Sequence, residues 1–86
     1  MNHARKSYMR IQDPLSEVEG GIGVNEPVFL LRAKDKAAAE TVRYWANLVK
    51  EMGGDLDIVV SAMKQADAMD AWEPKQVPDM PPGDAS

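Results

Sequence analysis

EPVFLLRAKDKAAAETVRYW, residues 26–45, is the stretch that decides the fold. An apolar run over residues 28–31 gives way to mixed charges, and a run of alanines follows. Alanine is the best helix former, and the apolar residues after it recur at helical spacing. Asp35 stands where an N-cap belongs, because its carboxylate can accept from the free amides of a first turn. We therefore predict a helix over residues 36–52.

The apolar run before this helix predicts a strand. Proline is tolerated at the first position of a strand, and Val28 and Phe29 favour β-structure. A strand over residues 28–33 needs a backbone partner, since even a two-stranded hairpin is marginal on its own. That partner is a short strand over residues 7–11, SYMRI, or the same strand of a second subunit, or both. The predicted interface residues are Val28, Phe29, Leu30 and Leu31.

A second helix is predicted over residues 56–72, after a glycine pair that ends the first. The short connection favours an antiparallel αα-hairpin. Small residues on both apolar faces would let the axes approach closely, and the rings of Trp45 and Trp72 are expected to fill the wider parts of the core. The predicted fold class is mainly α, an antiparallel αα-hairpin preceded by one or two short strands and completed by oligomerisation.

The chain divides by composition into three parts. Residues 1–25 form an N-terminal arm with the 7–11 strand and a Gly-rich loop, and residues 26–73 hold the strand and the hairpin. Residues 74–86 contain four of the six prolines and are expected to be extended or disordered.

Charge and composition exclude several classes of function. The net charge is −4, with no dense cationic face for duplex nucleic acid. There is no cysteine and a single histidine, so a structural zinc site is not expected, and no cofactor is predicted. No apolar run reaches the length of a membrane span, which favours a cytoplasmic protein. We find no nucleophile and base in a catalytic pattern and predict that the protein is not an enzyme.

The best candidate for a binding site lies at the start of the first helix. A helix start and nearby cations both favour an anion, so a phosphate could dock there. The alternative is that these are solvated charges and that Asp35 already fills the anion role. The predicted ligand-binding residues are Arg32, Lys34 and Lys36, with Arg43 and Tyr44 further along the helix.

The E-P-V-F-x-L-R-A-x-D stretch followed by TVRYWA resembles short orphan proteins of bacteriophages and prophages. The resemblance covers about residues 25–72. It implies a phage setting, in the cytoplasm of the host cell, where very small proteins of this kind are often host-takeover or anti-defence factors. One class of such factors forms oligomers that sequester nucleotide signals.

Two functions follow as expectations. The first is a homo-oligomeric phage protein that binds and sequesters an anionic, nucleotide-like signal at the cationic helix start. The second is a protein–protein interaction or assembly module that binds a host or virion protein through its strand edge or a helix face.

Overall fold

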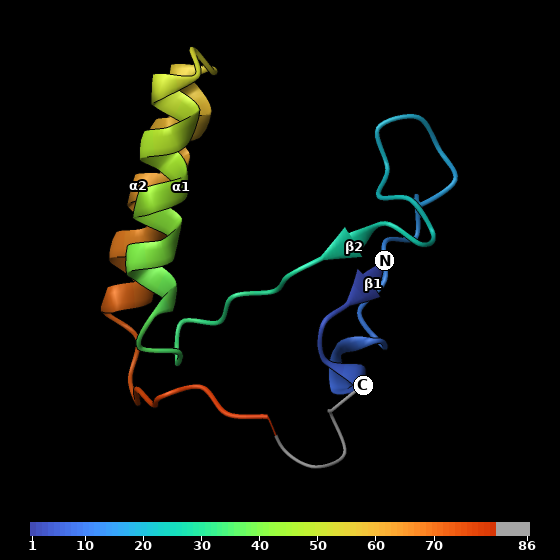
Figure 1. Ribbon diagram of the computed structural model, residues 1–86, viewed down its shortest axis with the longest axis horizontal. Coiled ribbons are helices and arrows are strands. Elements are labelled where there is room, and N and C mark those ends of the chain that lie inside the picture. Colours follow the sequence, from blue (N-terminus) through green and yellow to red (C-terminus); the bar gives the residue numbers. More distant parts are fainter. Residues whose placement is uncertain (81–86) are drawn as a thin grey trace. The chain divides into compact units, whose positions relative to one another are not determined.

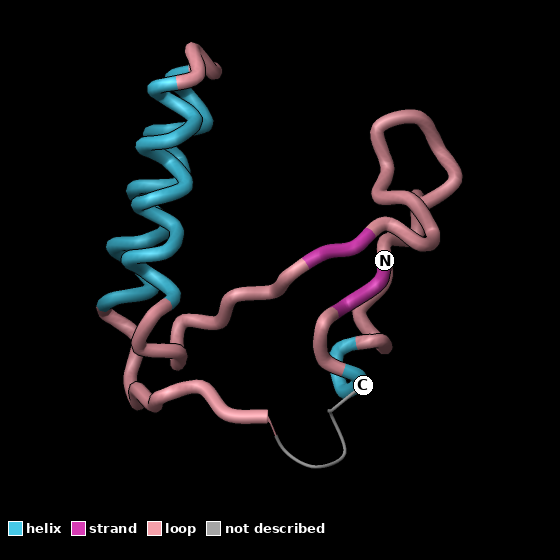
Figure 2. Tube along the Cα trace, viewed as in Figure 1, coloured by secondary structure: helices cyan, strands magenta, loops and turns pink. Residues whose placement is uncertain are grey.

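The computed structural model describes residues 1–80 and is mainly α-helical, with one short two-stranded parallel sheet (Figures 1 and 2). In chain order the elements are β1 (Asn2–His3), the 3₁₀ turn η1 (Lys6–Tyr8), β2 (Pro27–Val28), α1 (Ala38–Glu51) and α2 (Leu56–Asp70). The chain forms two compact units. The first comprises Met1–Leu30 and the segment that begins at Asp79, and the second comprises Leu31–Pro78.

Helix α1 begins two residues later than predicted. Its N-cap is Ala37, which has no capping side chain. Asp35 instead closes the turn before the helix, where its carboxylate accepts from the Ala37 amide at 2.7 Å and its carbonyl accepts from the Ala38 amide at 3.1 Å. The aspartate therefore serves the helix start, but from two positions before the N-cap.

The turn between the helices follows the predicted pattern. Gly53 has a φ of 77°, the left-handed conformation that ends many helices and that suits glycine. Asp55 caps α2 by accepting from the Asp57 amide at 2.8 Å. The two helices lie side by side, as expected of a helical hairpin (Figure 1).

The core of this unit is built from small residues. Ala38, Ala39, Ala66 and Met69 form one buried cluster, and Leu31, Ala33 and Val42 pack against it. The expected role of alanine in close helix contact is confirmed. The expectation that the two tryptophans fill the core is wrong, because the side chains of Trp45 and Trp72 are 48% and 56% exposed. The buried cluster consists of alanines and Met69, and both rings lie outside it.

The sheet is smaller than predicted and has a different partner. Asn2 pairs with Pro27 and His3 with Val28, in parallel. The predicted strand over residues 28–33 contributes only its first residue to β2. The predicted strand over residues 7–11 is wrong: its first residues lie in η1, and the amide of Ile11 bonds to the Tyr8 carbonyl at 2.8 Å. These local bonds use backbone groups that a strand would have paired.

The Gly-rich stretch is a closed loop held by one carboxylate. Asp13 accepts from the amides of Leu15 at 2.9 Å and Ile22 at 2.8 Å. These hydrogen bonds, that from Ile22 first, lower the pKa of Asp13. Gly21 is required here, since a Cβ atom would lie 1.8 Å from the Leu15 carbonyl oxygen. The loop thus returns the chain to β2.

The segment after α2 belongs to the second unit. Gln76 forms a parallel bridge with Asp35: its amide donates to the Lys34 carbonyl at 2.7 Å, and its carbonyl accepts from the Lys36 amide at 3.0 Å. Through Gln76 and Lys75, this part of the predicted Pro-rich tail is bonded to the segment that precedes α1. Residues 81–86 of the predicted Pro-rich tail lie outside the described part of the chain.

Candidate functional site

The predicted anion site lies in the turn that leads into α1. Arg32, Lys34 and Lys36 all belong to this short segment, and their main chain is tied down by Asp35 and Gln76. The Asp35 carboxylate already accepts from the Ala37 amide next to the helix start. One of the amides that an incoming anion would need is therefore occupied by a carboxylate of the chain itself.

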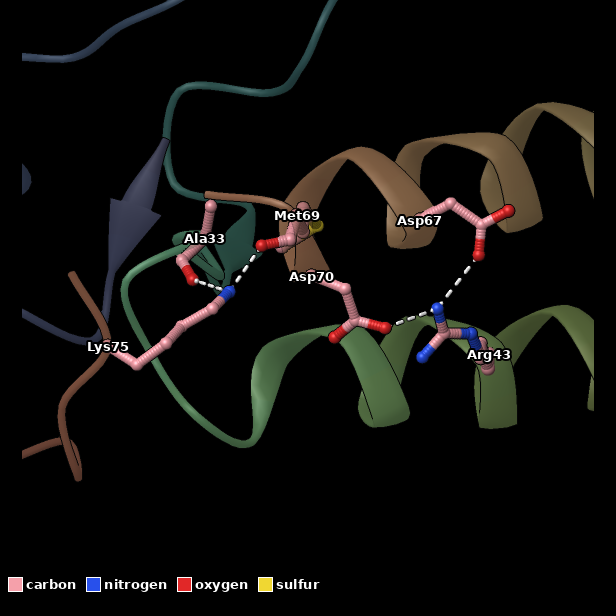
Figure 3. A network of polar contacts seen from close by, with 6 residues as sticks. All are labelled: Ala33, Arg43, Asp67, Met69, Asp70 and Lys75. Atoms are coloured by element: carbon pink, nitrogen blue, oxygen red, sulfur yellow. Dashed lines mark hydrogen bonds and ion pairs between the residues drawn. The ribbon is translucent and has the colours of Figure 1, made fainter. Parts of the chain in front are cut away.

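Arg43 is not gathered with these cations. Its guanidinium points to α2 and donates to the carboxylates of Asp67 at 2.9 Å and Asp70 at 2.6 Å (Figure 3). The hydrogen bonds to Asp67 and then Asp70 raise the pKa of Arg43 above its ordinary value. The two aspartates are three residues apart and so lie on one side of α2. Arg43 thus links the two helices. Tyr44, the last predicted ligand residue, is exposed.

Lys75 bonds to the chain at the base of the helical hairpin, where α1 begins and α2 ends. This residue was not identified from the sequence. Its ammonium donates to the carbonyl of Ala33 at 2.7 Å and to the carbonyl of Met69 (Figure 3). The Met69 carbonyl lies in the last turn of α2, where it also accepts from the Trp72 amide at 3.2 Å. A cation there also complements the negative end of the helix dipole. The available signal was a lysine shortly after a helix end.

The predicted interface residues, 28–31, divide between the two units. Val28 pairs with His3 in the sheet of the first unit, where Phe29 and Leu30 are 73% and 41% exposed. Leu31 begins the second unit and packs against its core. Only the first three of these residues are therefore available at one surface.

An open depression of about 420 Å³ lies along the sheet, lined by Asn2, His3, Ala4, Pro27, Val28 and Phe29. Its lining is mostly apolar, and His3 is the one titratable residue in it. His3, the single histidine of the chain, is buried, and its Nε2 donates to the Ile11 carbonyl at 2.6 Å. The depression can accept an apolar side chain.

Residues 1–80 hold no group of three or more His, Cys, Asp or Glu side chains that could bind a metal ion. Neither helix described in that range has the length and apolar character to cross a membrane. No family model, curated protein or solved structure matches the chain.

Proposed function

We propose that the protein is a non-enzymatic interaction module that binds a partner protein at residues 28–30. The observation that carries this proposal is the position of Phe29. It is 73% exposed and directly follows a strand that pairs on one side. A large exposed aromatic beside an unpaired strand edge is a feature of surfaces that bind other chains.

The backbone at this edge supports binding by strand addition. Within residues 1–80, β2 pairs with β1 alone, so no strand of that range covers its other edge. Pro27 contributes a carbonyl acceptor but no amide donor to the strand. An extended peptide that adds to such an edge gains affinity from main-chain hydrogen bonds, and its alternate side chains gain specificity from pockets. The depression beside Val28 and Phe29 supplies one such pocket.

Site-specific photo-crosslinking tests this function. A benzoylphenylalanine at position 29 is compared with the same residue at position 77, because Phe29 and Val77 are equally exposed, at 73% and 72%. In cells that produce the protein, position 29 is expected to yield one discrete crosslinked protein. Position 77 should not yield it, and Phe29→Asp should abolish its copurification. The same products from both positions would contradict the proposal.

Sequestration of a nucleotide-like signal by a phage anti-defence factor stays a prediction of the sequence. It now depends on Arg32, Lys34, Lys36 and Tyr44, because Arg43 is engaged by two carboxylates. Titration calorimetry with a panel of cyclic and linear nucleotides tests it, and a Lys34→Ala, Lys36→Ala double variant is the control. Absence of heat with every nucleotide would remove this hypothesis.

We also infer that the hairpin is antiparallel. Ala38, at the first position of α1, shares a buried cluster with Ala66 and Met69 near the end of α2. Arg43, in the first half of α1, reaches Asp67 and Asp70 in the last turns of α2. Both contacts join the start of one helix to the end of the other, which supports opposite directions.

A further inference from the structure

We propose that the hairpin of α1 and α2 dimerises with a second copy of itself, through a face that carries both tryptophans, to form a four-helix bundle. This face, the tryptophan face, consists of Trp45, Leu48, Met52, Ile58, Gln65 and Trp72. It is distinct from the partner-binding residues 28–30, so this inference does not rest on the function proposed above.

Each helix has two apolar stripes, whereas a helix in an isolated hairpin needs only the one that contacts its single neighbour. In α1, Ala38, Val42, Ala46 and Val49 form the stripe that is buried or half-buried. Trp45, Leu48 and Met52 repeat at i, i+3 and i+7 and form a second stripe beside it. These three side chains are 48%, 38% and 83% exposed. A helix in a four-helix bundle contacts two neighbours and needs both stripes.

Helix α2 repeats this arrangement. Val59, Ala62, Ala66 and Met69 are its buried or half-buried stripe. Ile58 and Gln65 are seven residues apart, the spacing of a seam between packed helices, and Trp72 continues this interval two residues beyond the last residue of α2. Ile58 is 50% exposed and Trp72 is 56% exposed.

The ion pair across the hairpin shows that the two outer stripes open on the same side. Within α1, the buried stripe separates Arg43 from Trp45 and Leu48 on the helical count. Within α2, it separates Asp67 and Asp70 from Ile58 and Gln65 on the helical count. Because Arg43 bonds to both aspartates, the charged flanks of the helices share one side. The two apolar stripes therefore share the opposite side.

A second copy fits this face in charge and in area. The chain carries a charge of −4, yet the tryptophan face holds no charged residue, so two copies can meet there without opposing carboxylates. Since an aromatic side chain presents about 150–250 Å², the two tryptophans and three aliphatic residues leave on the order of 500 Å² exposed per copy. Two such faces approach the ~1,000 Å² of a specific interface.

The hairpin also lacks the core that it would need to stand alone. The buried hydrophobic side chains in the described part of the second unit are four alanines and Met69. Domains of this size usually add a disulfide, a metal or a second subunit. The chain has no cysteine, and residues 1–80 contain no metal-binding cluster. A second subunit on the tryptophan face would bury the large side chains that the hairpin leaves exposed.

Sedimentation velocity on the full chain at about 1–300 µM tests the proposal, with Ile58→Glu compared with Val60→Glu. These two positions are matched: both are β-branched residues of α2, exposed by 50% and 51%, but only Ile58 lies on the tryptophan face. Wild type and Val60→Glu are expected to form dimers, and Ile58→Glu to dissociate at least tenfold more readily. Circular dichroism checks that both variants keep their helices.

Cysteine crosslinking supplies an independent readout, because the chain has no cysteine of its own. Gln65→Cys is expected to crosslink two copies with a short bismaleimide, whereas Lys64→Cys, which points away from the tryptophan face, is not. A wild-type protein that stays monomeric throughout the concentration range would overturn the proposal. This holds also where another segment of the same chain covers the tryptophan face and so keeps the protein monomeric. Equal weakening by the two glutamate variants, or equal crosslinking at positions 64 and 65, would overturn it as well.

Discussion

The ammonium of Lys75 donates to the carbonyl of Ala33, 42 residues earlier in the chain and 2.7 Å away. The same group bonds to the Met69 carbonyl at the end of α2. One side chain thus joins the segment before α1, the end of α2 and the segment that follows it. This lysine therefore ties together the base of the hairpin, where α1 begins and α2 ends.

Lys75→Met is expected to destabilise the second unit by about 1–2 kcal/mol, because it leaves two carbonyls without their charged donor while keeping most of the apolar stem. Urea unfolding followed by circular dichroism measures the effect. Lys64→Met, on the exposed surface of α2, should change the free energy of unfolding by less than about 0.5 kcal/mol. Equal effects of the two substitutions would argue against a structural role for the Lys75 ammonium.

Gly53→Ala should lower the stability of the hairpin by about 1 kcal/mol, since alanine is strained at a φ of 77°. The cause is conformational, because a Cβ at this position meets no atom within 4 Å. Gly53→Asn is the matched control and should cost less, as asparagine tolerates the left-handed region better. Thermal unfolding of both variants gives the comparison, and a larger loss for asparagine would contradict the explanation.

The loop of residues 13–22 should loosen in acid. The pKa of Asp13 lies below its ordinary value of 3.8 because the carboxylate accepts from Ile22 and Leu15. A lowered pKa stabilises the folded loop above the ordinary value, and this contribution is lost as the pH falls through the lowered pKa. NMR titration should show the amide resonances of Ile22 and Leu15 shifting together below about pH 4. In Asp13→Asn these shifts should disappear.

His3→Phe should weaken the first unit by no more than about 1 kcal/mol. The substitution removes the hydrogen bond to the Ile11 carbonyl but keeps a ring that can contact Tyr8, at 6.4 Å between centroids. It also removes the buried Nδ1, which has no hydrogen-bond partner, and this recovers part of the lost stability. Protection of the Asn2 amide, which bonds to the Glu26 carbonyl at 2.8 Å, reports the change by hydrogen exchange. His3→Ala should lower this protection further, because the ring contact is lost as well.

The helices could be predicted from the sequence because their determinants are local. Apolar spacing, the Gly53 turn and the Asp55 cap all lie within a few residues of the elements that they define. Both predicted helices are present, and each of their ends lies within two residues of its predicted position. The buried alanines follow from the same spacing. Trp45 was misplaced because α1 has two adjacent apolar stripes, and spacing alone does not say which one is covered.

The contacts that sequence reasoning missed are those between distant residues. Asn2 pairs with Pro27, Asp35 with Gln76, and Lys75 with Ala33, and no local pattern links these positions. The candidate site failed in the same way at Arg43, whose partners lie 24 and 27 residues later. A cation that the sequence pattern places on a solvated helix face can still form an ion pair with residues that are distant along the chain. The sequence shows the chemistry of each residue, but it does not show which distant residues contact it in the folded chain.

The bridge between Asp35 and Gln76 has a mechanical consequence. It is parallel, and it lies close to both points where the chain enters and leaves the second unit, Leu31 and Pro78. Tension applied through those two points pulls the bridged segments lengthwise past each other. The two main-chain hydrogen bonds of Gln76 then bear the force together, instead of breaking one after the other. The helices between them are shielded from a pull along the chain until both bonds give way.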